Sequence, residues 1–256
     1  MSKLECFQFP YGSDNYGVLV HDKGSGQTAC IDAGDAGAAL SALNSHGWTL
    51  THLLITHHHA DHTAGLEQIK QSTSCQVIGP VERSKPITGI DKHVDDGAEF
   101  DFAGNTVTAI HTPGHTTDMI NFYFASDKLV FTGDTLFSMG CGRLFEGDAA
   151  MMLASITKLR NLPDDTQVYC AHEYTATNAR FALDVDPDNE DLKQRVKQID
   201  ALRGEGKPTI PVLLSVEKKT NPFLRIDDTG IRGTLNMKNA EDVAVFAELR
   251  ERRNGY

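Results

Sequence analysis

Four histidines and one aspartate lie within six residues, directly after an apolar run, and this cluster constrains the fold more than any other feature. The residues that follow the run Leu53–Thr56 are His57, His58, His59, Asp61 and His62. Side chains two apart in extended chain point to the same side, so His57 and His59 should converge. Burying so many imidazole and carboxylate groups without a cation or strong hydrogen bonds would be costly. The pattern predicts a metal site, and its ligands suit zinc, iron or manganese.

Three further candidate ligands each follow an apolar run of their own, and they are His115, Asp134 and His172. Residues that follow neighbouring strands can meet at one edge of a sheet, which is a natural place for a site. We expect Asp134 to lie between two metals and to offer one oxygen to each. A lone histidine beside a strand is more often structural, and we assign His21, His46, His52, His93 and His111 to that class. His58 points away from its neighbours and is assigned to packing or to support of the ligands.

Short apolar runs alternate with helical patterns over the first two-thirds of the chain. The predicted strands are Tyr16–Val20, Thr28–Ile31, His52–Thr56, Thr106–His111, Ile120–Phe124, Leu129–Thr132 and Gln167–Cys170. The predicted helices are Ala36–His46, Thr63–Gln71 and Ala149–Arg160. This mixture indicates an α/β (α+β) protein in which helices cover sheets.

A faint echo links two segments of this region. Gly17–Gly34 reads as strand, turn, strand and then Asp-Ala-Gly, and Asn121–Thr135 reads as strand, turn, strand and then Gly-Asp-Thr. Two similar halves would suit a duplicated β-sandwich.

The pattern changes after His172, where the predicted helices are Thr175–Asp184, Asn189–Arg203 and Asn239–Arg253. Asn239, followed by Asp242, resembles an N-cap. We therefore expect a catalytic domain over residues 1–173 and a smaller, mostly helical domain over residues 174–256.

Composition excludes several classes of protein. The net charge of −11 disfavours a nucleic-acid binder, which usually carries a basic surface. The five cysteines are odd in number and never in CxxC spacing, so a reducing cytoplasm fits better than a disulfide framework. Cys141 and Cys170 should be small buried hydrophobes. With no apolar run that could span a bilayer and no signal pattern, we expect a soluble, unexported protein that does not act on a membrane. We separately expect a monomer that acts on a small molecule.

The motif His57-His-His59-Ala-Asp61-His62 resembles the HxHxDH signature of the metallo-β-lactamase superfamily, and the later ligands match its remaining positions in order. The resemblance implies an αββα four-layer sandwich over roughly residues 1–173, with two divalent metals, zinc first and iron or manganese as alternatives. It implies one metal on His57, His59, His115 and Asp134, and a second metal on Asp61, His62, Asp134 and His172.

A closer resemblance is carried by five motifs. They are Thr56-His-His-His, Thr112-Pro-Gly-His-Thr, Phe131-Thr-Gly-Asp-Thr-Leu-Phe, Gly140-Cys-Gly-Arg-Leu-Phe-Glu-Gly147 and Ala171-His-Glu-Tyr-Thr175. They look like glyoxalase II, the hydroxyacylglutathione hydrolases, and the likeness extends over essentially the whole chain. It implies hydrolysis of S-(2-hydroxyacyl)glutathione, above all S-D-lactoylglutathione, to D-lactate and glutathione, the last step of methylglyoxal detoxification.

The implied chemistry agrees with the residue types. Two metals about 3.5–4 Å apart can share a water and lower its pKa toward neutrality, so that hydroxide becomes the nucleophile. The leaving thiolate has a thiol pKa of about 8.5 and needs no dedicated acid. Asp61 and His62 are the expected catalytic residues, acting with the ligand set in activating the hydroxide.

The resemblance places glutathione on Arg143, Tyr174, Arg250 and Arg253. Helical spacing supports the last two independently, because Val243, Phe246, Ala247, Arg250 and Arg253 fall on one face while Arg252 points away. An ordinary basic helix end, favoured by the helix dipole, is the alternative. Two positions depart from the family pattern: lysine is common where Arg253 stands, and an aromatic hydroxyl can occur where Phe145 stands.

Other proteins of the same fold fit the sequence less well. A β-lactamase would normally be exported, a nuclease would want a basic groove, and a diiron oxidoreductase would carry a flavin domain. A persulfide dioxygenase also handles glutathione but uses one iron. A non-catalytic module with structural zinc would usually have a closed site with cysteine ligands. Seven His and Asp ligands favour an open catalytic pair.

Overall fold

The computed structural model describes residues 4–256, and the chain divides into two compact units. Unit 1 comprises Met1–His111 and Thr116–Gly133, and unit 2 comprises Thr112–His115 and Asp134–Tyr256. The domain boundary expected near residue 173 remains a prediction.

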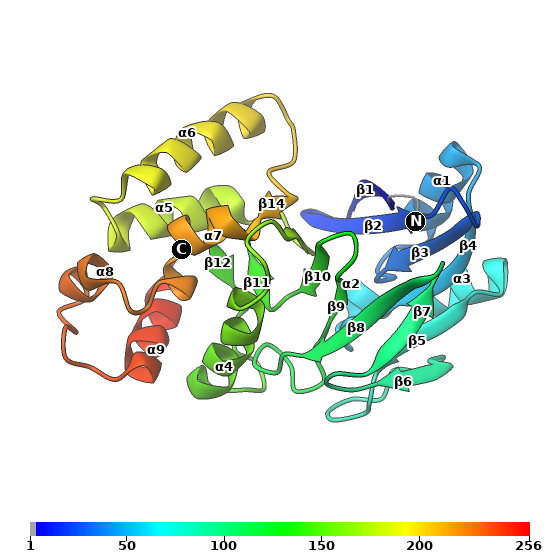
Figure 1. The fold of residues 1–256 in the computed structure, drawn as a ribbon, viewed down its shortest axis with the longest axis horizontal. Helices are drawn as coiled ribbons and strands as arrows, with labels where there is room; N and C mark the ends of the chain where they lie inside the picture. The colour runs from blue at the N-terminus through cyan, green and yellow to red at the C-terminus, as the bar shows by residue number, and fades with distance from the viewer. Residues whose placement is uncertain (1–3) are drawn as a thin grey trace. The chain divides into compact units, whose positions relative to one another are not determined.

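Unit 1 contains two sets of paired strands (Figure 1). The first sheet has the order β1-β2-β3-β4-β5-β6, with antiparallel pairing from β1 to β3 and parallel pairing from β3 to β6. Its strands are β1 (Glu5–Tyr11), β2 (Asn15–His21), β3 (Gln27–Ile31), β4 (Thr49–Leu54), β5 (Gln76–Pro80) and β6 (Lys92–Val94). The second set pairs antiparallel in the order β10-β9-β8-β7. Its strands are β7 (Glu99–Phe102), β8 (Asn105–His111), β9 (Ile120–Phe124) and β10 (Leu129–Gly133).

Strand burial follows the chemistry of the residues. In β7, Phe100 and Phe102 are buried while Glu99 and Asp101 are exposed, the period of two that places alternate side chains on opposite faces. In β10 every residue is buried, so both of its faces are covered.

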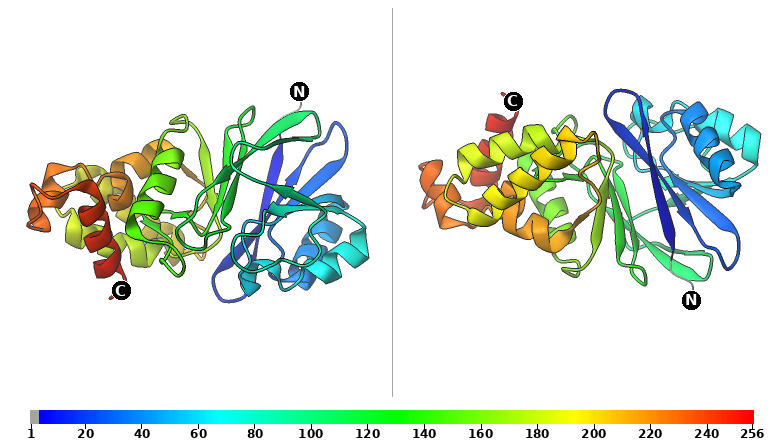
Figure 2. Two further views of the ribbon diagram at one scale, coloured as in Figure 1. Left: turned by 90° about the horizontal axis from the view of Figure 1, so that it is seen from below. Right: turned by 90° about the horizontal axis from the view of Figure 1, so that it is seen from above.

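Two helices of unit 1 pack against the first sheet. They are α1 (Ala36–His46) and α3 (Leu66–Thr73), preceded by the single turn α2 (Ala60–Thr63), and Figures 1 and 2 show α1 and α3 along the same sheet. Asp35 caps α1 by accepting the Ala38 N–H at 2.9 Å, and Gly47 ends the helix in the left-handed conformation. The buried faces of the helices join one core with β4, which contributes Leu53. Burying a side chain of this size stabilises the fold by about 1.5–3 kcal/mol.

Unit 2 is mostly helical. It contains the helices α4 (Ala149–Arg160), α5 (Thr175–Val185), α6 (Glu190–Gly204), α7 (Leu214–Thr220), α8 (Thr229–Thr234) and α9 (Asp242–Arg253), and the 3-10 turn η1 (Pro222–Leu224). Its strands are the hairpin β11 (Leu136–Phe137) and β12 (Gly140–Cys141), and the antiparallel pair β13 (Gln167–Cys170) and β14 (Val212–Leu213). A buried cluster of Met139, Ala179, Ala182, Leu192 and Ile199 packs α5 against α6.

All seven predicted strands are confirmed, as are the helices over Ala36–His46 and Ala149–Arg160 and the first two helices after His172. The helix predicted over Thr63–Gln71 is wrong at its start, because Ala64 and Gly65 separate α2 from α3. The Gly65 N–H donates to the Ala33 carbonyl at 2.6 Å, which takes this residue out of the helical pattern.

The N-cap predicted at Asn239 is also wrong, since α9 begins at Asp242 after Glu241, which makes no side-chain capping bond. The Arg232 guanidinium binds the Ala240 carbonyl at 2.7 Å and also reaches Asp242. These bonds hold the segment before Asp242 in turns.

Candidate metal centre

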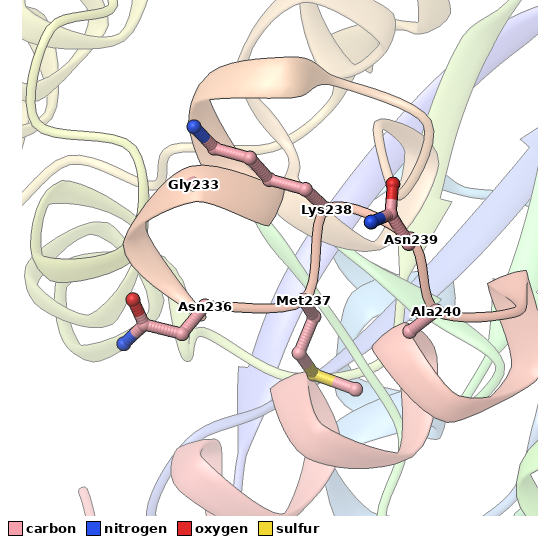
Figure 3. A pocket seen from close by; sticks show the side chains of 6 residues that line it. All are labelled: Gly233, Asn236, Met237, Lys238, Asn239 and Ala240. Carbon is pink, nitrogen blue, oxygen red and sulfur yellow. The ribbon is translucent and has the colours of Figure 1, made fainter.

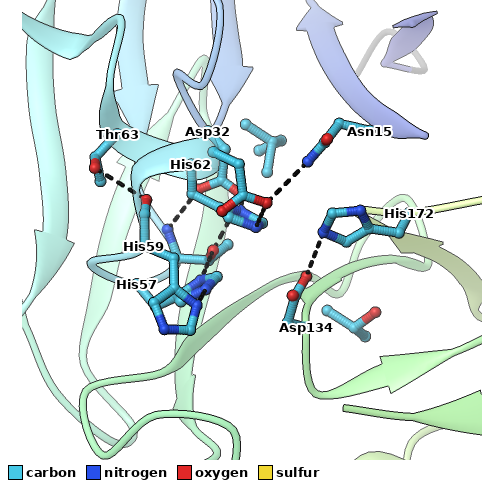
Figure 4. A network of polar contacts seen from close by, with 12 residues as sticks. Asn15, Asp32, His57, His59, His62, Thr63, Asp134 and His172 are labelled. Carbon is cyan, nitrogen blue, oxygen red and sulfur yellow. Dashed lines mark hydrogen bonds and ion pairs between the residues drawn. The ribbon is translucent and has the colours of Figure 1, made fainter. Parts of the chain in front are cut away.

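The four predicted ligands of unit 1 lie together after β4, and Figure 4 shows three of them, His57, His59 and His62. His57 Nε2 is 3.0 Å from His59 Nδ1, and the ring centroids of His57 and His62 are 4.1 Å apart. His62 Nε2 is 3.3 Å from Asp61 Oδ2. Asp61 and His62 lie on a helical turn, α2. His57 and His62 are buried, whereas the Asp61 side chain is exposed, so the cluster has a solvent-facing side.

Asp32, a residue that the sequence analysis did not assign, organises this cluster. It follows β3 and is buried. Its Oδ1 accepts the Thr56 N–H at 2.8 Å, and its Oδ2 accepts the Thr56 hydroxyl at 3.0 Å and His62 Nδ1 at 2.8 Å (Figure 4). One carboxylate therefore orients the strand end and one ligand directly.

In the neutral form of each ring, these bonds decide which nitrogen carries the proton. Asp32 is an acceptor, so neutral His62 donates from Nδ1 and keeps a lone pair on Nε2. Thr56 gives its hydroxyl proton to Asp32 and therefore accepts from His57 Nδ1 at 3.0 Å, which leaves the His57 Nε2 lone pair for another partner. His57 Nε2 lies 3.0 Å from His59 Nδ1, and His62 Nε2 lies 3.3 Å from Asp61 Oδ2.

This arrangement fits a cation. Two ligand atoms that each lie about 2.0–2.1 Å from a tetrahedral cation are about 3.3 Å apart. The His62 Nε2 to Asp61 Oδ2 separation of 3.3 Å has this size. A neutral imidazole lone pair beside a carboxylate oxygen is repulsive unless a positive charge sits between them.

Close backbone packing supports Asp61. A Cβ at Gly34 would overlap the Asp61 carbonyl oxygen, so only glycine fits there. The Tyr11 hydroxyl donates to the same carbonyl at 2.9 Å, and Asn15 Nδ2 donates to Asp61 Oδ2 at 3.1 Å. The Tyr11 bond holds the backbone of Asp61, and the Asn15 bond orients its exposed carboxylate.

His58 turns away from the ligands, as predicted. Its Nδ1 is 3.1 Å from both oxygens of Asp118, which follows His115 in the sequence but belongs to unit 1. Both side chains are almost completely buried. The pair anchors the segment that carries His57 and His59.

The three predicted ligands of unit 2 gather around one carboxylate. His115 Nε2 is 3.3 Å from Asp134 Oδ2, and His172 Nε2 is 3.4 Å from Asp134 Oδ1 (Figure 4 shows the second contact). His115 Nδ1 donates to the Arg143 carbonyl at 2.8 Å, which leaves the Nε2 lone pair toward Asp134. Each oxygen of Asp134 thus has its own imidazole at a ligand–ligand distance, an arrangement compatible with a bridging carboxylate. A Cβ at Gly142 would overlap the Asp134 carbonyl oxygen.

Aromatic rings flank these ligands. The Tyr174 ring stacks on His172 with centroids 4.8 Å apart and an interplanar angle of 4°. The Phe145 ring lies 5.1 Å from His115 and is 59% exposed, and the Arg143 guanidinium lies over it at 5.9 Å. Two of the predicted substrate residues, Arg143 and Tyr174, therefore stand next to ligand histidines within unit 2.

The predicted arginines of α9 are held by hydrogen bonds. Arg250 is buried, donates to the Cys141 carbonyl at 2.6 Å, and lies over the Phe223 ring at 5.5 Å. Arg253 is half-buried and donates through Nε to Asn178 Oδ1 at 2.8 Å. Burial, and next the charge of Arg250, lower the pKa of Arg253, and Arg143 and Arg180 act in the same direction. Four guanidinium groups thus share one region of unit 2.

The predicted face of α9 is partly wrong. Val243 and Ala247 are exposed, and the buried residues of the helix are Val245, Phe246, Leu249 and Arg250. Arg250, which donates to the Cys141 carbonyl, lies on this buried face. The inward position of Arg250 and the outward position of Arg252 are confirmed.

The cysteines form no disulfide. Cys141 and Cys170 are buried, as predicted, and burial raises the pKa of both thiols, that of Cys170 to about 12. Neutral thiols of this kind are poor metal ligands and nucleophiles.

A hollow elsewhere in unit 2 is lined by no histidine, cysteine or carboxylate side chain. It has a volume of about 420 Å³ and lies at the segment between α8 and α9 (Figure 3). Of its lining residues only Lys238 is charged, beside Asn236, Met237 and Asn239.

Within residues 4–256, no helix has the length and apolar character needed to cross a bilayer.

Two family models match the chain. The model described as Metallo-beta-lactamase superfamily matches residues 12–172, and the model described as Hydroxyacylglutathione hydrolase C-terminus matches residues 173–256.

Similar proteins match along the whole chain. The Hydroxyacylglutathione hydrolase of Rhizobium meliloti (strain 1021) is 49% identical over 256 residues, which is 100% of both chains. A protein of the same name from Brucella ovis is 51% identical over 252 residues, 98% of each. Among solved structures, ETHE1 from Myxococcus xanthus superposes with a TM-score of 0.66 at 25% identity, covering 100% of both chains. These similarities confirm the expected metallo-β-lactamase fold with a helical C-terminal region.

Proposed function

Because the chain belongs to the hydroxyacylglutathione hydrolase family of the metallo-β-lactamase superfamily, we propose that it hydrolyses S-(2-hydroxyacyl)glutathione thioesters. The substrate above all is S-D-lactoylglutathione, and the products are D-lactate and glutathione. This reaction completes the detoxification of methylglyoxal. The proposal is for a monomeric enzyme in the cytoplasm.

The observation that carries the proposal is the arrangement of imidazole lone pairs and carboxylate oxygens in each unit. At His62, at His115 and at His172 a ring nitrogen lies 3.3–3.4 Å from a carboxylate oxygen. Hydrogen bonds on the other nitrogen place a proton on Nδ1 of His62 and of His115, so that the neutral rings present Nε2 as a ligand atom. Neutral imidazoles and carboxylates at these separations suit the coordination of divalent cations, which supports the proposal.

We assign two divalent cations, most simply zinc, to seven ligands. His57, His59, His115 and Asp134 would hold one, and Asp61, His62, Asp134 and His172 would hold the other. When bound, a cation pair lowers the pKa of a bound water and polarises the thioester carbonyl.

The chain's own residues then have separate tasks. Asp32 keeps His62 and, through Thr56, His57 in the tautomers that present Nε2 as a ligand. Asn15 holds Asp61 at the solvent-facing side of the unit 1 cluster, where a reacting thioester can approach. The leaving thiolate is stable enough to depart without a positioned acid, which agrees with a site made of ligands alone.

Positive charge in unit 2 supports glutathione as the carrier of the acyl group. Glutathione has two carboxylates, and guanidinium groups bind carboxylates through paired hydrogen bonds. Arg143, Arg250 and Arg253 meet no carboxylate within residues 4–256, although the chain carries a net charge of −11. We assign these arginines, with Tyr174, to substrate binding.

Asp134→Ala tests the proposal. Turnover of S-D-lactoylglutathione should be abolished and bound metal lost, because one carboxylate serves both cations. Asp200→Ala removes an exposed carboxylate from α6 and should leave both properties unchanged. Full activity of the Asp134→Ala protein would overturn the two-metal assignment.

A further inference from the structure

The buried side chain of Asn178 connects two segments of unit 2 to the arginine at the end of α9. Its Oδ1 accepts from Arg253 Nε at 2.8 Å, and its Nδ2 donates to the Ser138 carbonyl at 2.9 Å. Asn178 lies on α5, and Ser138 lies at the tip of the β11–β12 hairpin. Both ends of one amide are therefore used, and the amide cannot turn without breaking both bonds.

The anchor of this amide is rigid. Glu217, which is fully buried, accepts the Ser138 hydroxyl at 2.9 Å and the Met139 N–H at 2.7 Å. The amide of Asn221 donates to the carbonyls of Phe137 and Gly140 at 3.2 and 3.1 Å. The polar groups of the β11–β12 hairpin thus form hydrogen bonds with Asn178, Glu217 and Asn221.

Space for the amide is made by a glycine. A Cβ at Gly140 would lie 2.5 Å from Asn178 Nδ2, closer than real side-chain contacts allow. The hairpin therefore approaches α5 closely enough for the bond to Ser138 only because residue 140 has no side chain.

The hydrogen bond from Arg253 to Asn178 restricts the Arg253 side chain. Arg253 is the last residue of α9, and helix ends fray. Its Nε is its one side-chain hydrogen-bonding atom with a partner within residues 4–256, so both Nη groups stay available. A lysine at this position would have a single nitrogen for both tasks.

We propose that Asn178 is a positioning residue for substrate binding: it holds Arg253 through Nε so that the two Nη groups present a preformed fork to a carboxylate of the glutathione thioester. A flexible arginine must lose rotamer freedom when it binds a carboxylate, and a side chain already held in place avoids that loss. The inference rests on the proposed function for its ligand.

The test is a double-mutant cycle on the full-length, metal-loaded protein with S-D-lactoylglutathione. Asn178→Ala should raise KM about two- to ten-fold, the size expected for one side chain that must be ordered on binding, with kcat unchanged. Arg253→Ala should raise KM at least as much, and adding Asn178→Ala to it should have no further effect. Arg252→Ala, which removes the neighbouring exposed arginine, should leave KM near the wild-type value.

A second substrate separates positioning from a general structural role. S-D-lactoyl-N-acetylcysteamine has the same thioester but no carboxylate, so its kinetics should be the same in all these proteins. The inference is overturned if Asn178→Ala raises KM equally with and without Arg253, or if it impairs both substrates alike.

Two further measurements keep the test decisive. If Asn178→Ala does not fold, Gly140→Ala displaces the same amide and takes its place in the cycle. Calorimetric binding of S-methylglutathione, which cannot be hydrolysed, tests the coupling without turnover. Coupling in this binding with no thioester hydrolysis would refute the proposed function alone, and hydrolysis without coupling would refute the role of Asn178 alone.

Discussion

Replacing Asp32 by asparagine should weaken metal binding although Asp32 touches no metal. Asp32 accepts three hydrogen bonds, two on Oδ2 and one on Oδ1, from Thr56 and His62. An asparagine offers one oxygen and one NH2 group in the same space. If the NH2 takes the Oδ2 position, it faces His62 Nδ1–H, and if it takes the Oδ1 position, it faces the Thr56 N–H.

In either orientation, two hydrogen-bond donors face each other in a buried environment. The first favours the other tautomer of His62, which would protonate the Nε2 that serves as ligand. Loss of such a supporting carboxylate costs about 10–100-fold in metal affinity, which is about 1.4–2.8 kcal/mol. The unsatisfied donor should also lower the free energy of unfolding of the metal-free protein by about 1–3 kcal/mol.

The assay is competition for zinc against a chelator of known affinity, with urea unfolding of the metal-free protein alongside. Asp35→Asn is the matched control, because asparagine caps a helix as well as aspartate and Asp35 caps α1. Equal zinc affinity in Asp32→Asn, Asp35→Asn and the wild type would refute the tautomer argument.

Two further predictions follow from buried contacts. Burial raises the pKa of Glu217 above 4.5, so the native state holds this proton more tightly than the unfolded chain and stability falls as pH rises from about that value. Glu217→Gln should flatten this fall in urea unfolding at a series of pH values, and an unchanged slope would contradict it. Gly142→Ala should cost about 1–3 kcal/mol and reduce metal content, because its Cβ would overlap the Asp134 carbonyl. Gly204→Ala, whose Cβ meets open space, should not destabilise; equal losses of stability and metal in both variants would contradict the packing argument.

Much of the fold could be predicted from the sequence where local pattern decides structure. Ile120–Phe124 and Gln167–Cys170 are short apolar runs between turns, and both strands have the expected bounds. The strand Glu5–Tyr11 was not predicted, because it pairs on one side only, includes Pro10 and has few buried residues. The short helix Leu214–Thr220 was missed because tertiary packing, and not its own periodicity, stabilises it.

The ligands were easier to predict than their supports. His57, His59, Asp61 and His62 stand out because a buried cluster of imidazoles and a carboxylate is hard to stabilise without a cation. Asp32 could have been found from the echo between Gly17–Gly34 and Asn121–Thr135, since it follows its hairpin as Asp134 follows the other. Asn178 left no signal, because its role depends on a contact with a residue 75 positions away that only the packing of α9 creates.

The central claim is that this chain is a metal-dependent glutathione thioester hydrolase. The direct measurement is the rate of S-D-lactoylglutathione hydrolysis by the purified protein, before chelation, after chelation and after return of zinc. We expect turnover that disappears with the chelator and recovers with metal. Absence of turnover in a protein that holds two metal ions per chain would contradict the substrate assignment, and turnover that survives complete metal removal would contradict the mechanism.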